Sequence, residues 1–168
     1  MKNIISLQDL MTAQLQNVYA AESQWNTSLR DNLPLAHAEI VREMLEHSIK
    51  HTSKHINELG EILQKLEAGL PELSHGSAAQ MAKDNKELLN RTADPEVRDA
   101  ALILTHQCMN HYLIAKYGTL SSYARLLQME PVATRLHRIL EEEKTEDELL
   151  TKVAEGKINP KAKSPVIM

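Results

Sequence analysis

The chain has 168 residues, 42% of them hydrophobic and 25% charged, which is enough for one domain with a sizeable core and argues against several domains. Five glycines and six prolines supply few turns, so long helices are favoured and an all-β fold is excluded. The net charge of -4, without a cluster of lysine and arginine, argues against nucleic acid as the main partner.

Proline, glycine and capping residues divide the chain into segments with helical periodicity. In chain order, helices are expected at residues 6–32, 36–68, 77–91, 96–128 and 132–155. Ser6 with Asp9, and Asp94 with Pro95, are typical of helix starts. Four long helices with short connections predict an all-α antiparallel four-helix bundle, in which the short helix joins the second long helix to the third.

Carboxylates interrupt the apolar stripes of the first and last long helices. Glu22 lies at the centre of the stripe of the first helix. Glu143 and Asp147, spaced i and i+4, fall within the apolar arc of the last helix, and Glu146 lies near its edge. Neither arc carries lysine or arginine. Because burial of an unpaired carboxylate is costly, these residues must become protonated, pair with a base on another helix, or bind a metal cation.

Histidines on the second long helix are candidate partners for these carboxylates. His55 lies inside the apolar arc, His51 lies on its margin, and His47 lies further out. Their i, i+4 spacing stacks the imidazoles on one face, an arrangement that can hold a divalent transition metal. Taken alone, a histidine on a helix margin is more often a surface residue or a hydrogen-bonded core residue.

The third long helix adds one polar position to the predicted interior. Asn110 lies on the inward stripe of this helix, where it is expected to face Glu22 and Glu143. A hydrogen-bonded core amide and a direct metal ligand are both consistent with its position. Cys108 lies off the stripe and has no partner at zinc-finger spacing, so it is not expected to be a ligand.

Three groups of residues resemble a known pattern. They are RDAALI at 98–103 with HY at 111–112 and YGTL at 117–120, LEEEK at 140–144 followed by Asp147, and Ala21-Glu22 followed by Gln24. Together they resemble the YciE/YciF family of bacterial ferritin-like stress proteins, over roughly residues 5–155. The resemblance implies a ferritin-like bundle with an added short helix, which packs as a homodimer and is related to the di-iron proteins.

The resemblance also implies a metal centre inside the bundle. In the di-iron pattern, two helices each give one glutamate, and each of the other two gives a carboxylate with a neighbouring ligand one turn later. Glu22 matches a single glutamate, and Glu143 with Asp147 matches a paired helix.

The other two helices depart from this pattern. Asn110 and Leu113 stand where the family has glutamates, and His51 and His55 align where it tends to have a glutamate and a glutamine. A bridging carboxylate is therefore missing. We expect a remodelled centre that holds one ion in preference to two.

Two functions of different classes are consistent with these residues. In the first, the chain binds a transition metal (Fe, Mn or Zn) through Glu22, His51, His55, Glu143 and Asp147, with Asn110 as an outer or weak ligand. In the second, the chain is a non-catalytic helical stress or assembly protein that has lost the di-iron site, and its carboxylates pair with protonated histidine. Haem binding is a more distant alternative. The sequence leaves open whether any reaction is catalysed.

The remaining expectations concern the ends and surroundings of the domain. Residues 1–156 are expected to form the bundle, and the basic stretch 157–168 is expected to be a flexible tail. The single cysteine, Cys108, and the absence of a long apolar run predict a cytoplasmic protein without a membrane span. Apolar residues off the inward arcs, such as Leu10 and Ile49, favour a homodimer.

Overall fold

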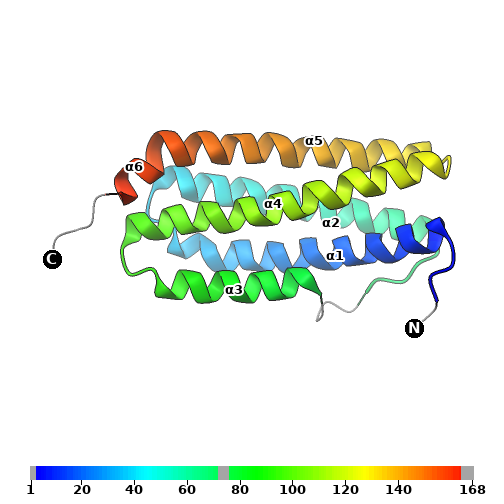
Figure 1. Cartoon of the computed structure of the whole chain (residues 1–168), viewed down its shortest axis with the longest axis horizontal. Helices are drawn as coiled ribbons and strands as arrows, with labels where there is room; N and C mark the ends of the chain where they lie inside the picture. Colours follow the sequence, from blue (N-terminus) through cyan, green and yellow to red (C-terminus); the bar gives the residue numbers. More distant parts are fainter. Residues whose placement is uncertain (1–2, 72–75, 164–168) are drawn as a thin grey trace.

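Four long helices lie side by side along the molecule, and a shorter helix runs along the edge of the bundle (Figure 1). The computed structural model describes residues 3–71 and 76–163. The helices are α1 (Leu7–Asn32), α2 (Glu39–Lys65), α3 (Ser77–Arg91), α4 (Pro95–Leu126) and α5 (Glu130–Val153). The described residues contain no strand, so the predicted all-α bundle with a short helix between the second and third long helices is confirmed. None of the described helices combines the length and apolar character that a membrane span requires.

Each helix reverses the direction of the one before it (Figure 1). In chain order α3 follows α2 and precedes α4, and it carries the chain back along the edge of the bundle. The closest pairs are α4 with α5 and α1 with α2, and α1 also packs on α4. Helices α2 and α5 contact each other over far fewer residues. This looser pair leaves a groove that leads to the polar interior.

Two helix starts have the predicted side-chain caps. The Ser6 hydroxyl accepts a hydrogen bond from the backbone N–H of Asp9 at 3.0 Å. A carboxylate oxygen of Asp94 accepts from the N–H groups of Glu96 and Val97 at 2.8 and 3.0 Å. Each cap satisfies amide donors that have no partner within the first turn of a helix.

Helix α2 begins three residues after the expected position 36 and is capped from another helix. The chain first makes a short 3₁₀ turn at Leu33–Leu35. The two carboxylate oxygens of Asp99 on α4 then accept from the backbone N–H groups of His37 and Ala38, at 2.8 and 2.7 Å. Asp99 is only 1% exposed. This buried carboxylate ties the start of α2 to the first turns of α4.

The C-terminal part of the bundle extends beyond the predicted boundary at residue 156. Helix α5 continues into a π-helical turn, η2 (Ala154–Ile158), and a short helix, α6 (Asn159–Ala162), both of which contact α4. Ile158 is 3% exposed and belongs to the core. An apolar side chain within the predicted tail therefore anchors its first residues on the bundle. Residues 164–168 of that tail lie outside the described residues.

Polar side chains interrupt the apolar core midway along the bundle. The buried polar residues include Glu22, His55, Asn110 and Glu143, which come from α1, α2, α4 and α5 respectively. Four helices thus each contribute at least one buried polar residue to the interior. The arrangement of these side chains determines what the interior can bind.

Candidate metal centre

Glu22, His55 and Glu143 form a compact buried cluster, called the inner group below. Nδ1 of His55 lies 3.3 Å from an Oε1 atom of each carboxylate. The three residues are 0%, 1% and 4% exposed, and each offers one ligand atom within 4.8 Å of the others. All three belong to the larger set of residues that the sequence predicted to converge inside the bundle.

The inner group forms because each member occupies a core position of its helix. Glu22 lies one turn from the buried side chains of Val18 and Trp25, and Glu143 lies one turn from Ile139. Residues three and four apart share a face of a helix, so the apolar neighbours turn each carboxylate inward. His55 is held in the same way, by the packing of Leu59.

The distances within the inner group are compatible with ligands that share one metal ion and also with an ion pair. Two atoms bound tetrahedrally to one ion at about 2.1 Å lie about 3.4 Å apart, close to the observed separations. The Tyr117 hydroxyl donates a hydrogen bond to Oε1 of Glu22 at 2.5 Å. Oε2 of Glu22 is buried and has no hydrogen-bond partner. Such an orphaned oxygen is costly unless a proton or a cation satisfies it, so the donor set fits a metal ion.

In the metal-free protein, the inner group retains protons. Burial opposes the charging of His55, but its interactions with Glu143 and Glu22 outweigh burial and raise the pKa of His55 from 6.5 to about 11. Burial, together with the charge of Glu22, raises the pKa of Glu143 from 4.5 to about 8, although His55 partly offsets the rise. At neutral pH, His55 and Glu143 therefore each carry a proton that a metal ion has to displace.

Helix α4 contributes no carboxylate to the inner group. Asn110 is buried, and its Nδ2 lies 3.4 Å from the backbone carbonyl oxygen of Glu143, to which it donates. Leu113 is buried one turn later. Asn110 therefore links α4 to α5 at Glu143, the position of a hydrogen-bonded core amide, which was one of the two roles that the sequence left open.

A second cluster, called the outer group below, consists of His51, His55 and Glu142. Each of these residues also offers a ligand atom within 4.8 Å of the others. Oε2 of Glu142 lies 2.9 Å from Nε2 of His55. The other oxygen of Glu142 accepts from Arg138 at 2.5 Å and from Lys54 at 3.2 Å. Burial opposes ionisation of Glu142, but the hydrogen bonds from His55, Arg138 and Lys54 lower its pKa to about 2, so it remains a carboxylate.

His51 differs from His55 because it remains neutral. Burial and the neighbouring His47 lower the pKa of His51 below 6.5, and the nearby carboxylates offset this only in part. The rings of His47 and His51 have centroids 4.1 Å apart. Nδ1 of His51 is buried and has no hydrogen-bond partner. A neutral imidazole with a free nitrogen is available as a metal ligand.

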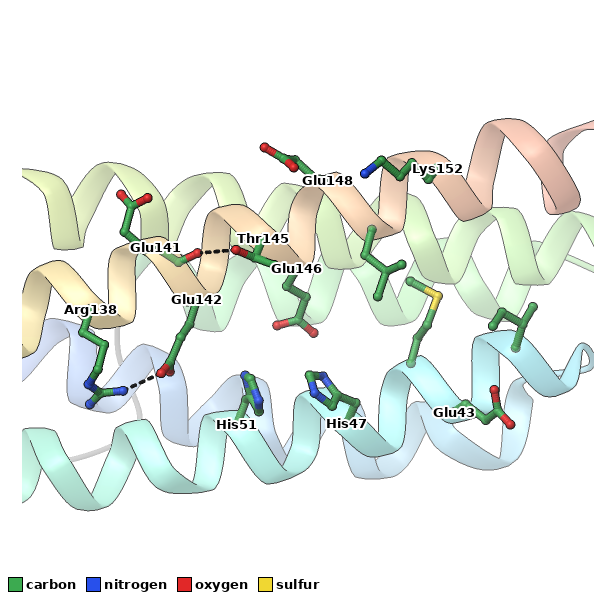
Figure 2. Close-up of a pocket in the computed structure, with 13 residues that line it drawn as sticks. Glu43, His47, His51, Arg138, Glu141, Glu142, Thr145, Glu146, Glu148 and Lys152 are labelled. Carbon is green, nitrogen blue, oxygen red and sulfur yellow. Dashed lines mark hydrogen bonds and ion pairs between the residues drawn. The ribbon is translucent and has the colours of Figure 1, made fainter.

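The outer group opens on the groove between α2 and α5, which has a volume of about 710 Å³. Figure 2 shows His47 and His51 rising from α2 toward Glu142 and Glu146, which descend from α5. Apolar side chains, including Met44, line the far end of the groove. Solvent thus has a route to His51 and Glu142, whereas the inner group is enclosed.

Asp147 lies apart from both groups, although the sequence placed it among the ligands. One of its carboxylate oxygens lies 3.3 Å from Nε2 of His111, and the other accepts from Gln107 at 3.5 Å. Its neighbour Glu146 lies 3.4 Å from His106 and accepts a short hydrogen bond from Ser48. These polar partners on α4 and α2 hold both carboxylates away from Glu22.

Glu142 and Tyr117 belong to the site but were not among the predicted ligands. Glu142 is the middle residue of the acidic run 141–143, and its i, i+4 relation to Arg138 and Glu146 is the sequence signal that could have identified it. Tyr117 lies on the apolar stripe of α4 like any core residue. No feature of the sequence pattern indicates its hydrogen bond to Glu22.

Comparisons with known proteins agree with this fold. Residues 6–163 match the family described as Domain of unknown function (DUF892). Protein YciF of Escherichia coli strain K12 is 28% identical over 163 residues, which are 96% of this chain and 98% of YciF.

Solved structures extend the comparison. The crystal structure of the E. coli stress protein YciF matches with a TM-score of 0.86 and 27% identity, covering 93% of this chain and 99% of that one. YcfI from Rhodopseudomonas palustris matches with a TM-score of 0.85 and 29% identity, covering 91% of this chain and 98% of that one. The predicted resemblance to YciE/YciF proteins is confirmed.

Proposed function

The chain belongs to the DUF892 family, and on that premise we propose that it is a YciF-like stress protein that binds one transition metal ion at the inner group. Similarity to the E. coli stress protein supports the first part of the proposal. The donor atoms of Glu22, His55 and Glu143 support the second. The proposal leaves open any catalysed reaction.

The observation that carries the proposal is the arrangement of buried charge around His55. Two carboxylates approach the same imidazole nitrogen at 3.3 Å, and one oxygen of Glu22 has no hydrogen-bond partner. Within the described residues, no lysine or arginine pairs with Glu22 or Glu143. A divalent cation would satisfy all three donors at once, which a single imidazolium proton does not do.

The donor set indicates the kind of ion and the number bound. Two carboxylates with one imidazole suit Fe, Mn or Zn. A dinuclear centre of the di-iron type needs further carboxylates that bridge the ions. The positions on α4 where they would lie are occupied by Asn110 and Leu113. This loss of negative charge supports one ion in preference to two.

The alternative function is that of a non-catalytic helical stress or assembly protein with a polar core. One observation favours it: Glu143 and Glu22 raise the pKa of His55 to about 11, against the effect of burial, so a stable ion pair forms without a metal. In that case the inner group only holds α1, α2 and α5 together. The two functions differ in whether a metal displaces the protons.

Elemental analysis after equilibration with metal tests the proposal. The protein is purified without a histidine tag, stripped with chelator, dialysed against Fe(II), Mn(II) or Zn(II), and analysed for bound metal. We expect one ion per chain in the wild type and a much lower occupancy in Glu143→Leu. The matched control is Glu141→Leu, because Glu141 lies on the same helix but is exposed and pairs with Lys144. Metal-free wild type, or full binding by Glu143→Leu, would contradict the proposal.

A further inference from the structure

The imidazole of His55 faces a different set of ligands with each of its two nitrogens. Nδ1 points to the inner group, at 3.3 Å from Glu22 and from Glu143. Nε2 points to the outer group, at 2.9 Å from Glu142. The two clusters are therefore not independent, because both contain the same ring.

The chemistry of imidazole prevents both clusters from using His55 fully at the same time. A neutral imidazole has one nitrogen that accepts and one that carries a proton. When Nδ1 binds an ion in the inner group, Nε2 carries the proton and donates to Glu142. When Nε2 binds an ion in the outer group, Nδ1 carries the proton and donates to Glu22 or Glu143. In each state, a carboxylate of the group without the ion still accepts a hydrogen bond from His55.

The outer group is itself a suitable cation site. Two histidines and one carboxylate, with other positions open, form a common ligand set for Zn and for non-haem Fe. His51 brings a nitrogen without a hydrogen-bond partner, and the groove of about 710 Å³ gives water access to the remaining positions (Figure 2). These observations indicate an open site, in contrast to the enclosed inner group.

The outer group also has a feature that weakens cation binding. Oε1 of Glu142 already contacts the guanidinium of Arg138 and the ammonium of Lys54. Two neighbouring positive charges repel an incoming cation and stabilise the carboxylate without it. The inner group has no such contact within the described residues, so an ion is expected to be more stable there.

We propose that His51, His55 and Glu142 form a second, groove-facing cation site that competes with the inner group for His55. One ion binds first at this weaker, exposed site and then passes to the inner group as His55 exchanges one nitrogen for the other. The inference rests on the proposed function, because it requires an inner group that binds metal. It differs from a dinuclear centre, in which both positions would be filled together.

Titration with Co(II), followed by its visible absorption, tests the equilibrium part of the proposal. We expect one ion per chain in the wild type. We expect Glu22→Gln to bind Co(II) more weakly, with a changed spectrum, and the double variant Glu22→Gln with His51→Ala to lose that residual binding. Glu143→Gln serves as a second inner-group variant if Glu22→Gln does not fold, as judged by circular dichroism.

The rate of Co(II) uptake in a stopped-flow experiment tests the order of binding. Glu142→Gln should still bind one ion at equilibrium but should load it about tenfold more slowly, since the first site has lost its carboxylate. Arg138→Gln should load faster, because a repelling charge has gone. Arg135→Gln is the matched control, because Arg135 lies on the same helix but pairs with Glu61 outside the outer group.

The outcomes separate this inference from the proposed function. Two ions per wild-type chain, residual binding in Glu22→Gln that does not depend on His51, or unchanged uptake in Glu142→Gln would each overturn the second site. Those results would leave the inner centre intact. If the wild type instead binds no ion that depends on Glu22, the proposed function itself fails, and the exchange of one ion between two sites fails with it.

Discussion

His55 and Glu143 make the stability of the metal-free protein sensitive to alkali. The pKa of His55 is raised from 6.5 to about 11. Its contribution to the free energy of unfolding is therefore fully present below pH 6.5 and is lost as the pH rises through 11. The pKa of Glu143 is raised from 4.5 to about 8, so the folded state keeps a proton that the unfolded chain has released. Both effects lower the free energy of unfolding as the pH increases.

A bound metal should reverse this pH dependence at the inner group. Since the ion displaces protons from His55 and Glu143, its affinity increases with pH. We expect the melting temperature of the metal-free protein to fall between about pH 6 and pH 8, while the increment given by saturating Mn(II) grows over the same range. Melts at both pH values, with Glu143→Gln as the control that lacks an inner-group carboxylate, measure the two trends. A Mn(II) increment that is independent of pH would contradict the assigned protonation states.

Asp99 explains part of the sequence resemblance by a structural role. It belongs to the RDAALI stretch, and its carboxylate accepts from His37 and Ala38 at the start of α2. Its neighbour Arg98 donates to the backbone carbonyl of Thr92 at the end of α3. This family-like segment therefore joins three helices, away from the metal centre.

Replacing Asp99 should destabilise the fold without affecting metal binding. Asp99→Ala leaves two N–H groups without acceptors at the partly buried start of α2, so we expect a loss of about 3 kcal/mol in the free energy of unfolding. Urea unfolding measures the loss, and Asp84→Ala, at an exposed position of α3, is the control. A change below about 1 kcal/mol would show that water replaces the carboxylate as acceptor.

The sequence could predict the inner group because helical phase determines which side chains point inward. Glu22, His55 and Glu143 each replace an apolar residue of a stripe, and all three are buried. Phase does not determine how far apart two helices lie. Glu142 therefore escaped prediction, since its 2.9 Å contact with His55 depends on how α2 and α5 are spaced at the groove. Asp147 has a suitable phase, but Gln107 and His111 on the closely packed α4 hold it elsewhere.

At the scale of the elements, the helix positions were predictable and the ends were less so. Predicted and observed helices agree to within a few residues, because periodicity and caps are local signals. The late start of α2 depends on Asp99, which is distant in sequence. The continuation of α5 into η2 depends on the burial of Ile158 against the bundle. Tertiary contacts of this kind have no local signature.

Helices α2 and α4 both end with a residue in the left-handed conformation that is not glycine. Glu67 has φ 53° and Gln128 has φ 58°. In each case the next residue donates back into the last turn, Ala68 to Leu63 at 2.9 Å and Met129 to Ala124 at 2.8 Å. This is the Schellman arrangement, in which glycine is strongly preferred.

Glycine at position 128 should therefore stabilise the protein. We expect Gln128→Gly to raise the free energy of unfolding by about 1 kcal/mol, because glycine adopts positive φ without steric cost. Gln128→Val should lower it, since a β-branched side chain is least compatible with this conformation. Thermal melts compare the two variants. Equal melting temperatures for them would show that the turn relaxes to another conformation.

For the whole molecule, the homodimer remains a prediction. The two apolar residues that suggested it, Leu10 and Ile49, are half-buried in the single chain, and Ile49 packs against the core. More exposed apolar side chains lie elsewhere, among them Leu104 on α4 and Leu126 at its end. We expect light scattering to give twice the 19.0 kDa of one chain. A mass of one chain across micromolar concentrations would contradict the dimer.

The central claim, a metal ion at the inner group, is tested most directly by thermal melts of the wild type and Glu143→Leu, with and without excess Zn(II). Metal binding predicts that Zn(II) stabilises the wild type by about 4 kcal/mol at a thousandfold excess over Kd. It also predicts that Glu143→Leu responds far less to Zn(II) and is nearly as stable as the metal-free wild type, because burial raises the pKa of Glu143 to about 8 and favours its uncharged form there. No response of the wild type, together with a loss of about 3–5 kcal/mol in Glu143→Leu, would contradict the claim and identify the inner group as a structural ion pair.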